Sequence, residues 1–209
     1  MALLLAPGVW NSSAAEGTSV QELSERYGIN PTLGFKLGER TTLHFSYEYK
    51  THDQNVDRGG PSLGSRPFEY PIETFFGQPF ASFTTFDGHI ATATFEHETV
   101  GGLQIRNHTF FADYDKLYQN IFADSAVNGP GPGLVELDGY QSIAGRQNFV
   151  NQTDFSYSFT QGQHLRHTLV GGLEFGVQDN DEFRNLPVFG APGSGIFTLN
   201  VPALDPTVF

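Results

Sequence analysis

The chain contains three pairs of amphipathic stretches, and a short turn joins the two members of each pair. The pairs occupy residues 27–37 and 43–50, 90–97 and 103–111, and 148–159 and 167–175. In the second stretch, four aromatic or aliphatic residues alternate with polar ones: Leu43, Phe45, Tyr47 and Tyr49 against His44, Ser46, Glu48 and Lys50. Strict alternation predicts a β-strand with one apolar face and one polar face.

Long connections that are rich in glycine and proline separate the three pairs. They run from about residue 51 to 83 and from about 115 to 145, where the second contains the run GPGPG at 129–133. Each stretch has about 10 residues, which is the length of a tilted strand that crosses a bilayer. This short–long alternation predicts an all-β, antiparallel meander of about six strands. The meander would be a sector of a transmembrane β-barrel with short periplasmic turns and long extracellular loops.

A soluble antiparallel sandwich is the alternative, because its strands also alternate. Loops of about thirty residues are rare in compact domains, and here they would follow every second strand and none of the others. The composition also suits a barrel wall, with 20 Phe and 8 Tyr against 1 Met and 1 Trp. These observations favour the membrane interpretation.

Charge and composition exclude several other classes. The net charge of −12 disfavours a nucleic-acid partner, and the absence of cysteine excludes disulfides and thiolate metal sites. No apolar run reaches the roughly 18 residues of a membrane helix. Residues 1–6 are apolar but follow no Lys or Arg, so they resemble a signal peptide poorly, and we expect an N-terminally truncated chain.

Catalytic and metal-binding patterns are not recognisable. The segment Glu96-His97-Glu98 is rich in ligands, but strand geometry places His97 on the face opposite the two carboxylates. No nucleophile motif or phosphate loop is present. We therefore expect no catalytic residues, no metal site and no enzyme activity.

Several short strings, in a fixed order, then resemble one family. They are RYGINPTL at 26–33, DRGGPS at 57–62, GSRP at 64–67, FFGQP at 75–79, DYDKLYQN at 113–120, NFVNQTD at 148–154 and GGLEF at 171–175. Each string is weak alone, but together and in this order they resemble the barrel region of TonB-dependent siderophore receptors. The resemblance runs from about residue 26 to 185.

The resemblance implies a location in the bacterial outer membrane, in contact with its lipid, and uptake of ferric siderophores. The family has a barrel of about 22 strands around an N-terminal plug, and the TonB complex supplies energy through that plug. No plug is recognisable here, so a TonB contact is expected only through a segment that the chain lacks. Residues 1–25 stay unassigned, 26–178 match a partial barrel, and 179–209 are expected to be an extracellular loop or truncated C-terminal tail. Iron is expected only inside the siderophore ligand, with no cofactor.

Ligand contacts are expected in the loops. A ferric siderophore is commonly anionic and carries flat chelating groups, which suit arginines and exposed aromatics. The candidates are Arg58, Arg66, Tyr70, Phe75, Phe76, Tyr118 and Tyr140. Phe75 and Phe76 have the alternative role of packing the loop against the barrel rim. Two other functions stay open, a passive porin-like barrel and a secreted carbohydrate-binding β-domain.

The alternation also predicts side-chain directions. We expect eight residues to share the lipid-facing side: Leu33, Phe35, Phe45, Tyr47, Phe155, Tyr157, Leu169 and Leu173. Four polar residues should face the lumen instead: Glu48, Arg106, Gln152 and Glu174.

Overall fold

A computed structural model describes residues 3–13, 24–129, 133–162 and 165–207. Its long strands are β1 (Leu3–Ser13), β2 (Ser24–Lys36), β3 (Thr41–Asn55), β6 (Phe83–Glu98), β7 (Leu103–Ala123), β8 (Leu134–Gln161) and β9 (Leu165–Asn185). The short elements are β4 (Ser62–Leu63), β5 (Arg66–Pro67), the 3-10 helix η1 (Pro79–Ala81) and β10 (Leu199–Pro202).

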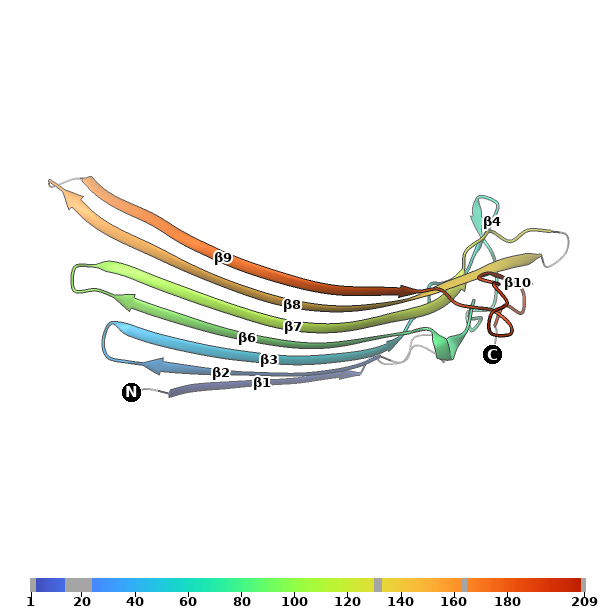
Figure 1. The fold of residues 1–209 in the computed structure, drawn as a ribbon, viewed down its shortest axis with the longest axis horizontal. Helices are drawn as coiled ribbons and strands as arrows, with labels where there is room; N and C mark the ends of the chain where they lie inside the picture. The colour runs from blue at the N-terminus through green and yellow to red at the C-terminus, as the bar shows by residue number, and fades with distance from the viewer. Residues whose placement is uncertain (1–2, 14–23, 130–132, 163–164, 208–209) are drawn as a thin grey trace.

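The long strands form one continuous, curved antiparallel sheet (Figure 1). The strand order is β1-β2-β3-β6-β7-β8, and β9 pairs with β8 on the edge opposite β7. The six strands expected from the alternation are therefore all present and neighbour one another in sequence order. In particular β3 pairs with β6, so consecutive hairpins are joined. A sandwich would have split these strands between two packed sheets.

The strands are longer than the expected 10 residues, and this corrects the predicted loops. β3 has 15 residues, β7 has 21 and β8 has 28. Most of the expected loop at 115–145 is therefore strand, whereas the expected loop at 51–83 loses residues 51–55 to β3 and otherwise contains only the short strands β4 and β5. β9 continues beyond residue 178 to Asn185. The apolar alternation stops where a strand leaves the expected bilayer span, but backbone pairing continues because polar side chains can occupy both faces of a sheet in water.

Two strands lie in segments where the sequence pattern predicts no strand. β1, within residues 1–25, pairs along its whole length with β2. β10, within residues 179–209, pairs with the start of β8, on the same edge that β9 occupies farther along. The rest of these segments is partly outside the described residues, as are residues 130–132 of the GPGPG run.

Short turns close the hairpins at one end of the sheet, which we call the turn end. Gly38 and Gly102 have φ angles of 105° and 81°, a left-handed conformation that favours glycine. A third positive-φ glycine, Gly162, follows β8. The three predicted turns at Glu39, Gly101 and Gln161 are confirmed.

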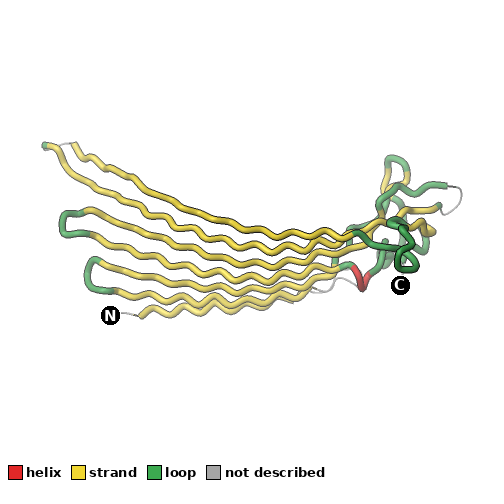
Figure 2. Tube along the Cα trace, viewed as in Figure 1, coloured by secondary structure: helices red, strands yellow, loops and turns green. Residues whose placement is uncertain are grey.

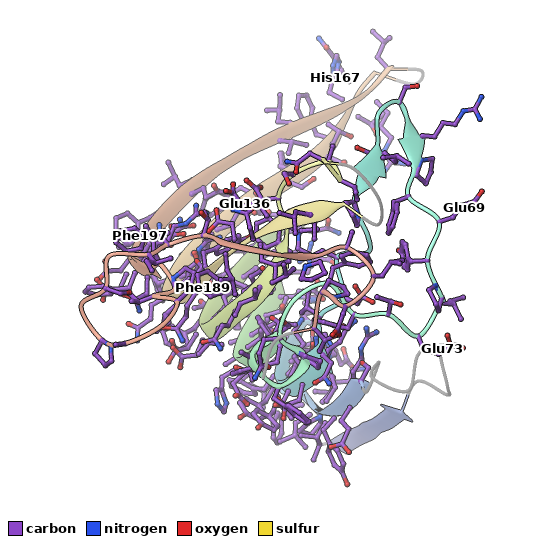
Figure 3. The ribbon with its side chains drawn as sticks, turned by 90° about the vertical axis from the view of Figure 1, so that its right-hand side faces the viewer. Glu69, Glu73, Glu136, His167, Phe189 and Phe197 are labelled. Atoms are coloured by element: carbon purple, nitrogen blue, oxygen red, sulfur yellow. The ribbon has the colours of Figure 1, made fainter. Side chains whose placement is uncertain are left out.

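Loops and the 3-10 helix η1 gather at the opposite end, which we call the loop end (Figure 2). This end also carries a small hydrophobic core. Its buried members come from four segments that are distant in the sequence: Phe76, Val127, Val135, Leu137, Val201 and Ala203. We call this packed region the cap. Figure 3 looks onto it, with Glu136 of β8 among its strands and Glu69 and Glu73 at its outer rim.

The strand pairing fixes which side chains share a face. Across each two neighbouring long strands from β2 to β9, every residue pair joins two even-numbered or two odd-numbered residues. Examples are Phe45 with Ala93 and Glu48 with Ile90. Odd-numbered side chains therefore form one face, the outer face, which holds the eight residues predicted to face lipid. Even-numbered side chains form the inner face, which holds Glu48, Arg106, Gln152 and Glu174. The predicted division into two faces agrees with this register.

The outer face exposes its aromatic side chains. Phe45, Phe155 and Tyr157 are 41%, 38% and 39% exposed, and Leu173 is 75% exposed. Contiguous apolar surface of this extent marks a membrane or interaction surface. Among the residues described, no helix is long and apolar enough to span a membrane.

Candidate ligand-binding wall

Positive charge gathers on the inner face near the loop end. One row of the inner face crosses β3, β6, β7 and β8. In this row each residue pairs with the next: Lys50, Gly88, Tyr114 and Arg146. Lys116 lies in the next row toward the loop end, opposite Ala144. Three cations from three strands therefore lie on one face within two neighbouring rows.

The outer face at the same height carries the opposite charge. Asp87, Asp115 and Asp181 lie in one row, and Asp113 and Asp179 in the adjacent row. All five are odd-numbered, so their side chains point away from the cations. The two acidic rows and the three cations thus lie on opposite faces of the sheet. Glu48 and Glu182 are acidic residues that share this part of the inner face with the cations, so three cations stand there against two carboxylates.

These cations line an open groove with a volume of about 790 Å³. Its walls are basic, aromatic and small side chains with one acidic residue, Glu182. The lining consists of Lys50, Phe86, Tyr114, Lys116, Tyr118, Tyr140, Ser142, Ala144, Arg146 and Glu182. The volume falls within the range of small-molecule sites, roughly 300 to 1,000 Å³. We call this surface the basic wall.

Two cations of the basic wall have no acidic partner among the residues that the structure describes. Lys50 Nζ lies 3.5 Å from Glu48 Oε1 and 5.7 Å from the centre of the Phe86 ring. Neither Lys116 nor Arg146 has a carboxylate within 4.0 Å among the described side chains, and Arg146 Nε donates to the amide oxygen of Asn180 at 2.7 Å. The positive charge of these two residues is therefore available to a ligand.

An aromatic and guanidinium stack extends the basic wall toward the cap. The rings of Tyr118 and Tyr140 stack at 5.5 Å, and the Arg184 guanidinium lies 4.2 Å from the centre of the Tyr140 ring. Burial raises the pKa of Tyr118 and the neighbouring Tyr140 adds to the rise, while Arg58 opposes it. Tyr118 therefore keeps its proton at neutral pH and can donate a hydrogen bond.

Of the predicted ligand residues, Arg58, Tyr118 and Tyr140 come together. The Arg58 guanidinium lies 3.8 Å from the centre of the Phe122 ring, and Phe122 meets Tyr140 edge-on at 6.2 Å. Arg58 thus reaches the same stack from the connection between β3 and β6. Cation–π contacts hold both arginines in place beside the wall.

The other four predicted residues lie in or beside the cap. Phe75 and Phe76 are only 4% and 3% exposed, and Phe76 belongs to the buried core. Tyr70 packs edge-on against Phe76 at 4.8 Å, while Arg66 is exposed on β5. The packing role suggested as the alternative for Phe75 and Phe76 matches this placement.

Lys50, Lys116 and Arg146 are not among the ligand residues predicted from the sequence. Lys116 falls within an expected loop, and Lys50 and Arg146 within no expected site, so the sequence pattern does not indicate that the three share a face. The sequence does contain one signal, the even numbering of all three cations. If the strands continue in the same register, even-numbered side chains must lie on one face of the sheet.

Toward the turn end the inner face is polar with mixed charge. Arg106 Nε lies 3.4 Å from Glu96 Oε1 and is paired in register with Asp154, and Asp154 accepts a hydrogen bond from Gln152 at 3.1 Å. His97 lies on the other face from Glu96 and Glu98, as expected. Within the described part of the chain, no three acidic or histidine side chains are grouped to hold a metal ion.

Similar proteins are known in sequence and in structure. The chain is 28% identical over 165 residues to the probable TonB-dependent siderophore receptor PiuA of Acinetobacter baumannii. It is 24% identical over 186 residues to the catecholate siderophore receptor Fiu of Escherichia coli K12. Its homologues are TonB-dependent siderophore receptors. These alignments cover 76% and 79% of the chain but only 22% and 24% of the relatives, so the chain spans about a quarter of their length or less.

Solved structures of both relatives share the fold. The open form of the E. coli ferric-catecholate import receptor Fiu superposes with a TM-score of 0.77 at 18% identity, over 97% of this chain and 33% of that one. The A. baumannii receptor PiuA superposes with a TM-score of 0.71 at 25% identity, over 84% of this chain and 26% of that one. No protein-family model matches the chain. The sheet thus has the fold of a sector of the barrel wall of these outer-membrane receptors.

Proposed function

We propose that this chain forms part of an outer-membrane receptor that takes up ferric siderophores with energy from the TonB complex. The homologues are siderophore receptors, which are transport proteins and not enzymes. The basic wall is the observation in this chain that carries the proposal. Unpaired cations beside stacked tyrosines suit an anionic aromatic chelate of iron(III), in which iron is part of the cargo.

The proposed placement puts the outer face against lipid and the inner face toward the lumen. The aromatic outer run on β8 extends from Phe149 to Phe159, which is about 35 Å along a strand. A strand tilted by about 45° projects this run onto about 25 Å, the height of the apolar band of such barrels. Arg58, Tyr118 and Tyr140 then lie above the bilayer, where a ligand arrives from outside the cell.

A direct test compares charge removal on the two faces of the intact protein. Lys116→Gln combined with Arg146→Gln should weaken binding of an iron(III) catecholate chelate about tenfold or more, because each charge-assisted contact contributes about 1.5–3 kcal/mol when well formed. Binding is measured by quenching of intrinsic fluorescence in outer-membrane preparations. The matched control, Asp115→Asn with Asp181→Asn, alters the outer face at the same height and should leave affinity unchanged. Equal affinity of both double variants would exclude the basic wall as the binding surface.

A further inference from the structure

Asn120, on β7, is a buried polar residue whose carboxamide has no partner. Only 1% of the residue is exposed, and within the part of the chain that the structure describes neither Nδ2 nor Oδ1 makes a hydrogen bond. Ser82 is also buried, but its hydroxyl donates to the Ile121 carbonyl at 3.5 Å and accepts from the Ile121 N–H at 3.1 Å. A buried polar group that stays unpaired costs stability, so Asn120 calls for an explanation other than packing.

The ring of Tyr140 lies across Asn120. Tyr140 on β8 is the cross-strand partner of Asn120, and both side chains lie on the inner face. Tyr118 and Phe122 flank Asn120 on the same face of β7. The Tyr140 ring contacts both of them, stacked on Tyr118 at 5.5 Å and edge-on to Phe122 at 6.2 Å. A ring that reaches the side chains on either side of Asn120 covers Asn120 itself. We call Tyr118, Phe122 and Tyr140 the aromatic cover.

The aromatic cover separates Asn120 from the groove of the basic wall. Tyr118 and Tyr140 line that groove, whereas Asn120 does not. The three rings of the cover are half-buried, so they meet solvent on one side. A cavity of about 350 Å³ adjoins both Asn120 and Tyr140, which gives the Tyr140 ring space to move. Asn120 therefore lies one layer of side chains behind the surface that we assign to the ligand.

Two arginines hold the aromatic cover in place. The Arg58 guanidinium lies 3.8 Å from the centre of the Phe122 ring, and the Arg184 guanidinium lies 4.2 Å from the centre of the Tyr140 ring. Both arginines are exposed, and neither has a carboxylate within 4.0 Å among the described side chains. Phenolate and carboxylate oxygens form charge-assisted hydrogen bonds with a guanidinium, which are stronger than its contact with a ring. An anionic ligand on the basic wall therefore competes with the rings for both arginines and loosens the cover.

We propose that Asn120 is a concealed specificity residue, which contacts the ligand once an anionic chelate has displaced the Tyr140 ring. The inference rests on the proposed function, because it needs a chelate that binds at the basic wall. A carboxamide offers both hydrogen-bond donors and an acceptor. Asn120 therefore favours a chelate that carries amide groups beside its metal-binding rings over one with unsubstituted rings. The stability that the unpaired carboxamide costs in the free protein is regained in the complex, where its hydrogen bonds are made.

Binding of two iron(III) probes tests the specificity. The probes are the iron(III) complexes of catechol and of its carboxamide derivative, a dihydroxybenzamide, and binding to the intact protein is measured by quenching of intrinsic fluorescence. Asn120→Leu should lower the affinity for the amide probe about fivefold, which corresponds to one hydrogen bond of about 1 kcal/mol, and should leave the affinity for the catechol probe unchanged. Unchanged affinity for both probes, or equal losses for both, would overturn this inference alone. A wild-type protein that binds neither probe would overturn the proposed function and the inference together.

The stability of the same variant in the absence of ligand gives an independent test. Asn120→Leu should raise the thermal midpoint of the loop end, because leucine has a similar volume and removes an unpaired buried group. Ser82→Ala is the matched control and should lower the midpoint, because it breaks the two hydrogen bonds with the Ile121 backbone. A merely structural asparagine would not combine higher stability with weaker binding. An unchanged or lower midpoint for Asn120→Leu would mean that the carboxamide is already satisfied in the free protein, which refutes the inference.

Thiol labelling tests the aromatic cover without any ligand. The chain has no cysteine, so a single introduced thiol is unambiguous. Asn120→Cys should react slowly with a water-soluble maleimide, and the added change Arg58→Gln should speed the reaction roughly two- to fivefold, because it removes one contact that holds the cover. Ala112→Cys is the control, since Ala112 is equally buried on the inner face of β7 but lies farther toward the turn end. Arg58→Gln should not change its rate. No acceleration at residue 120, or equal acceleration at both positions, would overturn the role of the cover.

Discussion

Replacing Phe155 by lysine tests the assignment of the two faces. Phe155 lies on the outer face, near the middle of the aromatic run that extends from Phe149 to Phe159 on β8. In the proposed placement a lysine there enters the hydrocarbon, which costs about 2–4 kcal/mol at the midplane of a barrel. Even about 2 kcal/mol lowers the ratio of assembled to unassembled protein about thirtyfold.

Gln152→Lys provides the matched control on the same strand. Gln152 lies on the inner face, pairs with Glu174 and donates to Asp154 at 3.1 Å. A lysine at this position meets two carboxylates in a solvated setting, where ion pairs contribute about 0–1 kcal/mol. We therefore expect normal assembly of this variant.

Assembly is measured as the heat-modifiable, folded band of the intact protein in the outer-membrane fraction. Phe155→Lys should reduce this band strongly, Gln152→Lys should not, and Phe155→Leu should behave as the wild type because it keeps an apolar side chain in lipid. Equal amounts of folded protein from the two lysine variants would refute the assignment of the faces.

Three further predictions concern the loop end. Gly77→Ala should destabilise the cap, because Gly77 has φ 135° and an added Cβ would collide with the backbone carbonyl of Ile121. Limited proteolysis should therefore cleave the cap of this variant faster. The control Gly101→Ala should leave the cleavage rate unchanged, because its Cβ would meet only Thr99 Oγ1 at 4.0 Å. Leu137→Ala, at a fully buried cap position, should cost about 2–5 kcal/mol and lower the thermal midpoint of the loop end, with exposed Leu63→Ala unchanged. Burial raises the pKa of Tyr118, so its contribution to stability is present below the ordinary pKa of 10.0 and is lost as pH rises through the raised pKa. Tyr118→Phe should therefore reduce the loss of stability at alkaline pH, measured by denaturation at a series of pH values. An unchanged dependence of stability on pH would contradict the burial of Tyr118.

The sequence predicts the bilayer part of the sheet well because one physical rule dominates there. Residues such as Phe45, Tyr47, Phe155 and Leu173 alternate with polar ones, and a strand with a period of two can present them only on one face. The short turns were equally clear, since Gly38 and Gly102 adopt φ angles that favour glycine. Six strands and their order follow from these two signals.

The sequence predicts the loop end poorly because the apolar alternation ends before the strands do. Near the loop end, both faces of β7 and β8 carry polar residues, so the alternation disappears while the backbone pairing continues. Lys116 and Tyr118 were therefore expected in a loop, although they lie on a strand. Long-range contacts such as that between Thr207 Oγ1 and the Phe75 carbonyl, at 3.0 Å, leave no local signal.

Part of the candidate site was recoverable by residue chemistry alone. Tyr118, Tyr140 and Arg58 were selected as aromatic or cationic loop residues, and the fold brings them to one stack. The same criterion also selected Phe75 and Phe76, because a sequence does not distinguish an aromatic side chain that packs a cap from one that faces a ligand.

Iron uptake by cells measures the proposed function most directly. Iron-starved cells that carry the intact protein are supplied with radiolabelled iron(III) as a catecholate chelate, beside cells that lack the gene and cells that lack TonB. We predict saturable uptake that requires both the protein and TonB. We also predict that the Lys116→Gln, Arg146→Gln double variant takes up less iron when the chelate is limiting. Uptake that is unchanged when the gene is deleted, or that continues without TonB, would contradict the account.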